Sequence, residues 1–502
     1  MNEQRPSELP IIILTGASGF VGRNFLKAYK DKFYFYAIAR RSQKVVGLPL
    51  HPNIEWMRVD ISIEHQVKYA FKKIKVKGGA DYVIHLAGYY DFGNEPNKAY
   101  KETNVEGTRH ILEACSMFSI KRFIFSSSVT VSTFDDPKRV ITEKSPCDAT
   151  FPYAVSKRKG EELLEKHSSK FPCTIVRFAA VYSDWCEYGP LYMFLSTWLS
   201  NSWNSTILGG KGESAIPYIH VRNLTSFLLR VIEKNEQLPD LITFIASPDG
   251  CTSHKELFKV ANRYDFGQEV QPNFIPKYLS LVGVALMDFV GRCIGRRPFE
   301  RIWMIRYIDL KLNIDASWSR EQLNWAPTKR YAVIRRLLFL IENMKRSPQE
   351  WTQRNQEALT KRFDNPKLLI CEFMNEHKDA VVKKSFLQLT TIEEFKTYRD
   401  LDPGKLKYRI QFIVQMIMAA IRTGDRMHVL SYANKLAKER YKEGFVAEEV
   451  IRAVELVANT MSSSLLELPQ LARKEKWIYD EIHMTSQLIA DEIEDTYWNA
   501  TL

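Results

Sequence analysis

The 502-residue sequence predicts an α/β fold with a doubly wound parallel sheet and a mixed second lobe, followed by an all-α helical bundle. Two observations support this prediction. Short apolar runs alternate with helical patterns from Ile11 to about Ile245, whereas only helical periodicity is present beyond about residue 365. The chain is also long enough for two or three domains, and 45% of its residues are hydrophobic.

Six continuous hydrophobic runs are the expected strands, in the order IIILTG, FYFYAIA, IEWMRVD, YVIHLAG, RFIFSSS and CTIVRFAAV. Continuous rather than alternating apolar residues are typical of parallel strands that helices cover on both faces. Beyond Val181 this rhythm loosens, which indicates a lobe that shapes a pocket. The polar segment MKRSPQEWTQRNQ contains a proline and indicates a boundary near residue 350. We therefore predict a first domain over 9–350, with its core over about 9–250 and its lobe mainly over 181–345.

The second predicted domain, 362–502, is an antiparallel helical bundle. Its pattern places apolar residues on one helix face at Val429, Tyr432, Ala433, Leu436 and Ala437. The glycines at 404, 424 and 444 mark expected helix ends. No metal-ligand spacing or catalytic cluster is recognisable in this part of the sequence.

Composition narrows the function classes. The net charge of +12 permits contact with nucleotides or anionic lipids, but a basic solvated surface is the favoured explanation. The basic residues are dispersed and no nucleic-acid module is present, so we expect no nucleic-acid partner. Seven cysteines without a C-x-x-C pair argue against disulfides and zinc. The N-terminal apolar run is too short for a signal peptide or membrane span, so we expect a cytoplasmic protein.

A glycine-rich turn, TGASGFVG, joins the first expected strand to a helix. Gly16 permits a tight turn, Gly19 lets the backbone approach a pyrophosphate, and Gly22 lets the helix pack on the strand. The start of the helix offers unpaired N–H groups and a favourable dipole to that anion. The expected phosphate cradle is completed by Ser18, Phe20 and Val21.

A tyrosine and a lysine stand four residues apart in FPYAVSKRKG, just after the proline of an expected helix start. Residues at this spacing share a helix face, so Tyr153 and Lys157 can reach one site. A free phenol has a pKa near 10, and ionisation at neutral pH requires lowering it by about three units, or about 4 kcal/mol. A cation one helical turn away supports that change.

Four motifs occur along the chain in a fixed order: the glycine turn, an asparagine in TNVEGTRHILEA, a serine in FIFSSSV and the Y-x-x-x-K pair. This order of motifs resembles the extended branch of the short-chain dehydrogenase/reductase superfamily, which has a Rossmann fold. The resemblance implies a tetrad of Asn104, a serine, Tyr153 and Lys157. Tyr153 would act as acid or base, the serine would hold the substrate oxygen, and Asn104 would support a water-linked proton route. Ser128 matches this serine best, with Ser127 second.

The resemblance also implies a nicotinamide cofactor. Asp60, with Ile61 after it, matches the adenine-binding aspartate, and HLAG (Leu86, Ala87, Gly88) matches the turn along the middle of the cofactor. NAD-preferring members carry an acidic residue where this chain has Arg40, followed by Arg41. Two arginines clamp a 2′-phosphate better than a ribose hydroxyl, so NADP is favoured and NAD is the second choice.

The sequence departs from the patterns of two related groups of enzymes, and these departures bear on which class of substrate it binds. Sugar-nucleotide dehydratases place acidic residues where Val129 and Thr130 follow the serines, and sugar-nucleotide epimerases often carry an asparagine where VRFAAVYSDW has none. The aromatic-rich stretch 184–203 instead favours an apolar substrate, as in the branch of 3β-hydroxysteroid dehydrogenases and dihydroflavonol reductases. We predict an NADP-preferring oxidoreductase for an apolar carbonyl or alcohol. The alternatives are an NAD-dependent sugar-nucleotide epimerase and an NADP(H)-sensing regulatory protein.

Further expectations concern partners. The apolar segment 276–297 ends in basic residues, and it is either a lobe helix packed on the core or a contact with a membrane surface. We expect a homo-oligomer. The segment ANKLAKERYKEGFVAEEVIRAVELV faintly resembles the helical sensor domain of bacterial stress-signalling regulators, which implies either a regulatory or a plain structural bundle.

Overall fold

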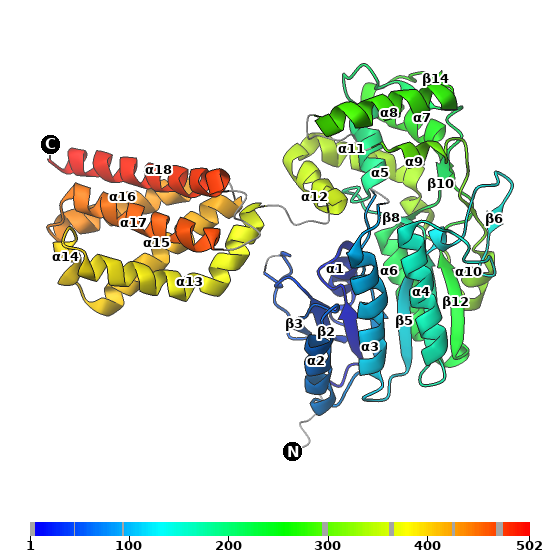
Figure 1. Ribbon diagram of the computed structural model, residues 1–502, viewed down its shortest axis with the longest axis horizontal. Helices are drawn as coiled ribbons and strands as arrows, with labels where there is room; N and C mark the ends of the chain where they lie inside the picture. The colour runs from blue at the N-terminus through cyan, green and yellow to red at the C-terminus, as the bar shows by residue number, and fades with distance from the viewer. Residues whose placement is uncertain are drawn as a thin grey trace. The chain divides into compact units, whose positions relative to one another are not determined.

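A computed structural model describes residues 6–44, 46–92, 95–293, 300–360, 366–423, 427–467 and 475–501 (Figure 1). The chain divides into two compact units, residues 1–361 and 362–502. Each unit has its own hydrophobic core. The first unit carries every residue that the sequence singled out for chemistry.

The first unit is built on a seven-stranded sheet with the order β12-β7-β5-β4-β1-β2-β3, and every neighbouring pair is parallel. The predicted doubly wound parallel sheet is therefore confirmed. Its strands are β1 (Ile11–Thr15), β2 (Tyr34–Ala39), β3 (Ile54–Arg58), β4 (Tyr82–His85), β5 (Arg122–Ser128), β7 (Cys173–Phe178) and β12 (Leu241–Ala246). Six of these lie within the predicted runs, and the edge strand β12 was not predicted.

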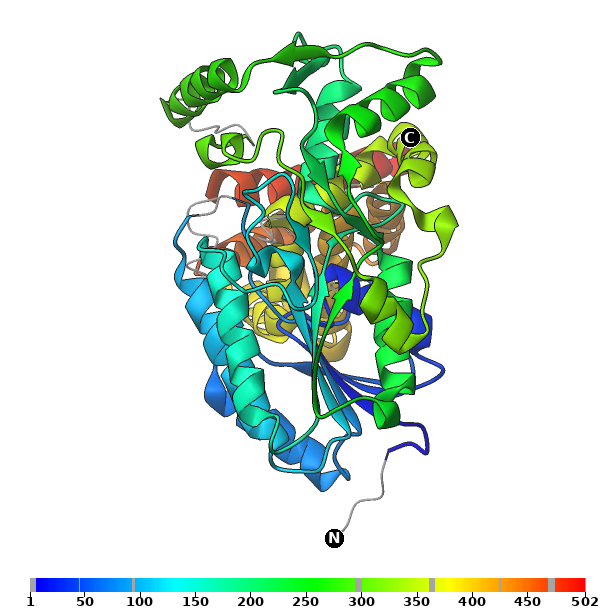
Figure 2. The same ribbon diagram turned by 90° about the vertical axis from the view of Figure 1, so that its right-hand side faces the viewer.

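Helices cover both faces of the sheet, which Figure 2 shows nearly edge-on. The core on one face takes side chains from α1 (Phe20–Tyr29) and α6 (Val221–Glu233). The core on the other face takes them from α2 (Glu64–Val76), α3 (Gly107–Cys115) and α4 (Pro152–His167). Within β1, Ile11 and Ile13 join one core while Ile12 and Leu14 join the other. Burial on both sides explains the continuous apolar runs.

The order of the strands reverses between β1 and β4, which lie side by side at the centre of the sheet. Ligands of doubly wound sheets bind outside the carboxyl ends of the strands at such a switch point. The loops after β1, β4 and β5 therefore frame the candidate site.

The second lobe of this unit packs α5 (Gly189–Trp198), α7 (His254–Phe266), α11 (Val333–Arg346) and α12 (Pro348–Thr360) around one apolar core. Helices α8 (Lys277–Cys293), α9 (Ile302–Ile305) and α10 (Ser317–Leu323) also follow the sheet core in sequence. Four two-stranded pairs complete the unit: β8 (Ala180–Tyr182) with β11 (Tyr218–His220), β9 (Ile207–Gly209) with β14 (Asn273–Ile275), β10 (Ala215–Ile216) with β13 (Thr252–Ser253), and β6 (Val140–Ile141) with β15 (Asn313–Ile314).

Two local features differ from the sequence-based expectation. The polar segment around residue 350 forms α12 rather than a linker, because Trp351 is buried in the lobe core and faces Tyr192 at 6.3 Å between ring centroids. The run CTIVRFAAV forms β7 and then β8, which pairs with β11 outside the main sheet. The first unit consequently extends beyond residue 350.

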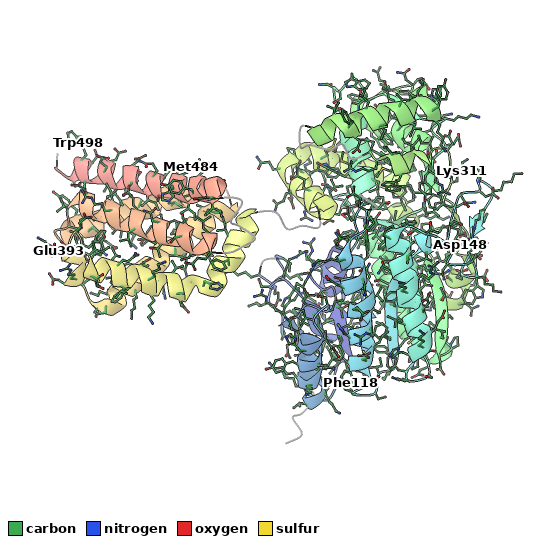
Figure 3. The ribbon with its side chains drawn as sticks, in the orientation of Figure 1. Phe118, Asp148, Lys311, Glu393, Met484 and Trp498 are labelled. Atoms are coloured by element: carbon green, nitrogen blue, oxygen red, sulfur yellow. The ribbon has the colours of Figure 1, made fainter. Side chains whose placement is uncertain are left out.

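The second unit is all helical among its described residues. Its helices are α13 (Pro366–Thr391), α14 (Lys396–Arg399), α15 (Pro403–Thr423), α16 (Met427–Lys442), α17 (Ala447–Leu466) and α18 (Glu475–Thr501). Gly444 follows α16 at φ +82°, Gly404 lies in the first turn of α15, and Gly424 lies outside the described residues. On α18, Met484 and Trp498 are exposed (Figure 3). None of the helices described in either unit is long and apolar enough to cross a membrane.

Candidate active site

The glycine turn after β1 packs against the turn after β4. Gly16 has φ +70°, and a Cβ there would lie 2.7 Å from the Ala87 nitrogen and from the Leu86 carbonyl carbon. A Cβ on Gly22 would overlap the Gly16 carbonyl oxygen. Both positions therefore require glycine. The Thr15 hydroxyl accepts a hydrogen bond from the Ala87 nitrogen at 3.3 Å, which joins the two turns.

Helix α1 starts directly after this turn. Gly19 is its N-cap residue and has no side chain to satisfy the first helical N–H groups. Phe20 and Val21 form the first turn, and Ser18 is buried before it. Amides at a helix start, without a side-chain cap and with a glycine that admits close approach, fit a pyrophosphate. The predicted cradle residues therefore lie together at the switch point of the sheet.

The residues predicted for the adenosine end lie at the ends of β2 and β3. Arg40 is exposed directly after β2, and the carbonyl of the half-buried Arg41 accepts a hydrogen bond from the Trp56 indole at 2.7 Å. The Asp60 carboxylate accepts hydrogen bonds from the Ser62 backbone N–H at 3.0 Å and hydroxyl at 2.7 Å. Ile61 is buried below it. The exposed Arg40 is therefore placed to bind an anionic group, and the Asp60 carboxylate is held in position by Ser62.

Tyr153 and Lys157 share one face of α4, with the Lys157 ammonium 6.0 Å from the phenol ring centroid. Gly88 borders the same ammonium, since a Cβ on it would lie 3.3 Å from Lys157 Nζ and 3.4 Å from Asn104 Oδ1. Asn104 is buried, and its side-chain amide donates to the Tyr89 carbonyl at 2.8 Å and to the Ser156 hydroxyl at 2.9 Å. The structure thus brings the HLAG turn, Asn104, Tyr153 and Lys157 together.

Asn104 lies in a π-helical segment, Tyr100–Glu106, which runs directly into α3. Such π-turns are frequent at functional sites because they redirect a side chain without ending the helix. Here the wider turn accompanies a buried amide that bridges the loop after β4 and helix α4. The sequence identified the asparagine but not this local geometry.

The three consecutive serines of β5 have different partners. Ser126 donates its hydroxyl to the His85 carbonyl at 2.9 Å, and Ser127 donates to the Glu161 carboxylate at 2.5 Å. The Ser128 hydroxyl lies 2.8 Å from the Thr130 hydroxyl and forms a hydrogen bond with Tyr153. Ser128 is therefore the serine on the side of the phenol, whereas Ser127 faces Glu161.

Burial raises the pKa of the Tyr153 phenol, the neighbouring Tyr100 adds to this, and the hydrogen bond from Ser128 opposes it. Burial also lowers the pKa of Lys157 to about 8, against the opposing effect of Glu161. The ammonium donates to the Ser126 carbonyl at 2.6 Å. At neutral pH Lys157 is therefore charged, and it is the cation that can stabilise a phenolate on Tyr153.

A buried ion pair, which the sequence motifs did not reveal, lies one turn further along α4. Glu161 accepts from two of the three Arg177 nitrogens, at 3.1 Å from Nε and 2.8 Å from Nη2, and both side chains are almost fully buried. The thiol of Cys147 also contacts the pair. A charged residue inside the apolar run CTIVRF is the signal that could have revealed it, because such a charge needs a buried partner.

His85 connects the central strands to Asn104. Its two ring nitrogens lie 2.7 Å from the Thr15 hydroxyl and 3.1 Å from the Thr108 hydroxyl, and Thr108 donates to the Asn104 carbonyl at 2.7 Å. Burial and then the charge of Lys157 lower the pKa of His85 to about 3. His85 is therefore neutral and holds the π-helical segment against β1 and β4.

An aromatic wall borders Tyr153. The ring of Tyr90 lies 4.5 Å from that of Tyr153 and 4.6 Å from that of Phe92, and Tyr188 lies 6.1 Å from Phe92. Burial is the first cause of the raised pKa values of Tyr90 and Tyr188. These rings form an apolar side to the site and keep their hydroxyls protonated. No group of three or more metal-ligating side chains is found among the residues that the structure describes.

Residues 12–244 match the model of the NAD dependent epimerase/dehydratase family. These residues, a little less than half of the chain, are similar to that family. The match spans β1 through most of β12 and includes every candidate site residue. The chain thus has the Rossmann domain of an NAD(P)-dependent enzyme of the short-chain dehydrogenase/reductase superfamily, as the sequence motifs predicted.

Two curated relatives illustrate the similarity. The dTDP-D-glucose 4,6-dehydratase of Dictyostelium discoideum is 25% identical over 267 residues, which are 47% of this chain and 58% of that protein. The putative UDP-glucose 4-epimerase of Methanocaldococcus jannaschii is 26% identical over 327 residues, which are 63% of this chain and 93% of that protein. The relatives favour a member of the epimerase/dehydratase family, and neither NADP preference nor an apolar substrate receives support from them.

Solved structures agree on the fold. The UDP-glucose 4-epimerase of Thermotoga maritima, solved with UDP-glucose, has a TM-score of 0.52 at 21% identity and covers 68% of this chain and all of its own. The UDP-glucuronic acid 4-epimerase of Bacillus cereus, in complex with UDP-glucuronic acid and NAD, has a TM-score of 0.50 at 17% identity and covers 67% of this chain and 99% of its own. Structural neighbours of this chain therefore include NAD-binding proteins.

Proposed function

We propose that the first unit is an NAD-dependent epimerase that inverts a carbinol carbon of a sugar nucleotide. The observation that carries the proposal is the grouping of Ser128, Tyr153 and Lys157 beside Gly88 at the switch point of the sheet. Support for the substrate class comes from the named activities of the relatives, which act on dTDP- and UDP-linked sugars.

The chain's own residues handle the proton. Ser128 holds the substrate hydroxyl and Tyr153 takes its proton as a phenolate. The Lys157 ammonium stabilises that phenolate against the burial that raises the pKa of the phenol. The Gly16–Gly22 turn binds the cofactor's pyrophosphate. When bound, the nicotinamide ring accepts the hydride and returns it. Return of the hydride to the opposite face of the resulting ketone, with return of the proton to its oxygen, would invert the centre, so no external oxidant is consumed.

Epimerisation is favoured over dehydration by the residues that follow Ser128. Expulsion of a neighbouring hydroxyl needs an acid beside the reacting carbon, and Val129 and Thr130 cannot supply one. The Thr130 hydroxyl instead contacts Ser128. This leaves oxidation and re-reduction of one carbon, without loss of a neighbouring group, as the reaction that the site supports best.

Two measurements on the purified full chain test the proposal. We expect NAD among the nucleotides released on denaturation, and interconversion of UDP-glucose or UDP-glucuronic acid with its 4-epimer. Tyr153→Phe should lower turnover at least a hundredfold, whereas Tyr69→Phe, at an exposed tyrosine on α2, should not. Turnover that survives Tyr153→Phe, or the absence of both NAD and interconversion, would overturn the proposal.

A second candidate is an NADP-preferring oxidoreductase for an apolar carbonyl or alcohol. The exposed Arg40 and the aromatic wall of Tyr90, Phe92 and Tyr188 favour it. It predicts that NADPH quenches tryptophan fluorescence at lower concentration than NADH, and that Arg40→Asp weakens NADPH binding at least tenfold while Arg263→Asp, on the distant helix α7, does not. Equal binding of the two nucleotides would reject this candidate and leave the epimerase.

A further inference from the structure

Helix α8 (Lys277–Cys293) presents an unusually apolar surface to solvent. Tyr278, Val282, Leu286 and Phe289 are each 62% to 68% exposed. Further exposed apolar side chains on the same helix are Leu279, Leu281, Met287 and Val290. Scattered exposed apolar residues are ordinary in proteins, but a contiguous set on one helix marks an interaction surface.

The four most exposed residues lie on one side of α8. With 100° between successive residues, Tyr278, Val282, Leu286 and Phe289 fall along one stripe, and Leu279 and Val290 widen it. Asp288 lies outside this stripe and is buried. The helix therefore buries its one acid and exposes its apolar stripe.

Neighbouring elements add to this apolar surface. Phe274 in β14 precedes the helix, and Ile302 in α9, which packs against α8, follows it, and both side chains are nearly half exposed. In Figures 1 and 2 the helix lies at the edge of the second lobe of the first unit. We define the apolar face by Phe274, the exposed residues of α8 and Ile302.

The sequence of α8 and of the residues that follow it carries a net positive charge. Residues 277–306 contain six basic residues (Lys277, Arg292, Arg296, Arg297, Arg301, Arg306) and two acidic ones (Asp288, Glu300), a net charge of +4. Residues 294–299, which include Arg296 and Arg297, lie outside the described part of the chain. Among the described residues, Lys277 is anchored at the start of α8, where its ammonium donates to the Arg306 carbonyl at 2.9 Å.

We propose that the apolar face of α8 binds the surface of a membrane that contains anionic lipids. The helix lies in the plane of the membrane, with its large side chains among the acyl chains and the exposed Lys277 and Arg306 at the level of the headgroups. It does not cross the membrane, since its 17 residues fall short of the roughly 20 that a span requires.

A second copy of the chain fits this face less well. Two-fold pairing of α8 with itself would bring the basic residues of both copies together around a shared apolar contact, and like charges in proximity are unfavourable. An anionic lipid surface meets the same charges with the opposite sign. Charge complementarity therefore selects the membrane over self-association.

Sedimentation of the full chain with lipid vesicles tests the proposal. Vesicles of phosphatidylcholine with 30% phosphatidylglycerol should bind the protein, and vesicles of phosphatidylcholine alone should bind it at least tenfold more weakly. The double variant Leu286→Glu/Phe289→Glu should lower binding to the anionic vesicles at least tenfold. Leu338→Glu/Phe339→Glu, a matched pair of exposed residues on α11, should leave binding unchanged. Nucleotide binding verifies that all variants are folded.

The proposal is overturned if the wild-type chain binds neither kind of vesicle, or if both double variants bind as the wild type does. It is also overturned if analytical ultracentrifugation of the lipid-free protein shows a dimer that Leu286→Glu/Phe289→Glu dissociates, since a second copy then covers the face. Binding that depends on phosphatidylglycerol and on Leu286 and Phe289 supports it. The test does not depend on which reaction the site catalyses.

Discussion

Replacing Lys157 by methionine should abolish turnover and at the same time stabilise the first unit at pH 7. Lys157 is 5% exposed, and burial lowers its pKa from 10.5 to about 8. The charged ammonium at this buried position therefore lowers the free energy of unfolding. Methionine fills a similar volume without a charge. Glu161 is not left alone in the variant, because Arg177 remains bonded to both of its oxygens.

The size of the effect follows from the shift in pKa. A fall from 10.5 to about 8 corresponds to about 3 kcal/mol of unfavourable free energy in the charged form. Loss of the hydrogen bond from Nζ to the Ser126 carbonyl offsets about 1 kcal/mol of that gain. A net gain of about 2 kcal/mol in a unit of 361 residues raises the unfolding midpoint by about 3 °C.

The same shift in the pKa of Lys157 determines how the stability of the protein depends on pH. Between pH 8 and 10.5 the folded wild-type protein binds fewer protons at Lys157 than the unfolded chain does, so this residue makes wild-type stability rise with pH across that window. The methionine variant lacks this contribution. Its advantage in the unfolding midpoint should therefore be largest at or below pH 8 and shrink as the pH approaches 10.5.

Differential scanning calorimetry of nucleotide-free protein measures the effect, and the transition that shifts on addition of NAD identifies the first unit. Lys159→Met, at an exposed position on the same helix, is the matched control and should change the midpoint by less than 1 °C. A Lys157→Met midpoint below that of the wild type at pH 7 would refute the reasoning, because it would mean that the buried ammonium contributes net stability.

Two further substitutions probe the surroundings of the site. Gly88→Ala places a Cβ 3.3 Å from Lys157 Nζ and should lower kcat/KM at least tenfold, whereas Gly283→Ala, with no atom within 4 Å, should have no effect; equal kinetics of the two variants would contradict the close approach. Glu161→Gln should cost about 3 kcal/mol in urea unfolding because it leaves Arg177 buried without its carboxylate, and Glu161→Gln/Arg177→Met should recover part of the loss; a cost below 1 kcal/mol would show that water reaches the pair.

Much of the fold and site was predictable because the signals are local in sequence. Strands buried on both faces leave continuous apolar runs, which is why β1 and β5 were readily identified. The glycine turn and the pair of Tyr153 and Lys157 each lie within a few residues, so spacing alone indicated their geometry. Strand β12 was missed because it returns to the sheet after a segment that belongs to the second lobe, and chain order does not reveal spatial order.

The remaining features depend on contacts between distant segments. The family resemblance ranked Ser128 first and Ser127 second, but sequence could not reveal what the other two hydroxyls bind, the His85 carbonyl for Ser126 and the Glu161 carboxylate for Ser127. The outward apolar face of α8 was equally undecided, because an amphipathic pattern gives the stripe but not the side on which the protein lies.

The geometry of α4 explains why Lys157 keeps a charge that Tyr153 can use. Tyr153, Lys157 and Glu161 follow one another at i, i+4 and i+8, so a phenol, an ammonium and a carboxylate share one face. If Glu161 had no other partner, it would neutralise Lys157. Arg177 instead takes both carboxylate oxygens, and the ammonium is left with the Ser126 carbonyl and the rings of Phe125 and Tyr153 as neighbours. The buried ion pair thus leaves the positive charge of Lys157 available to Tyr153.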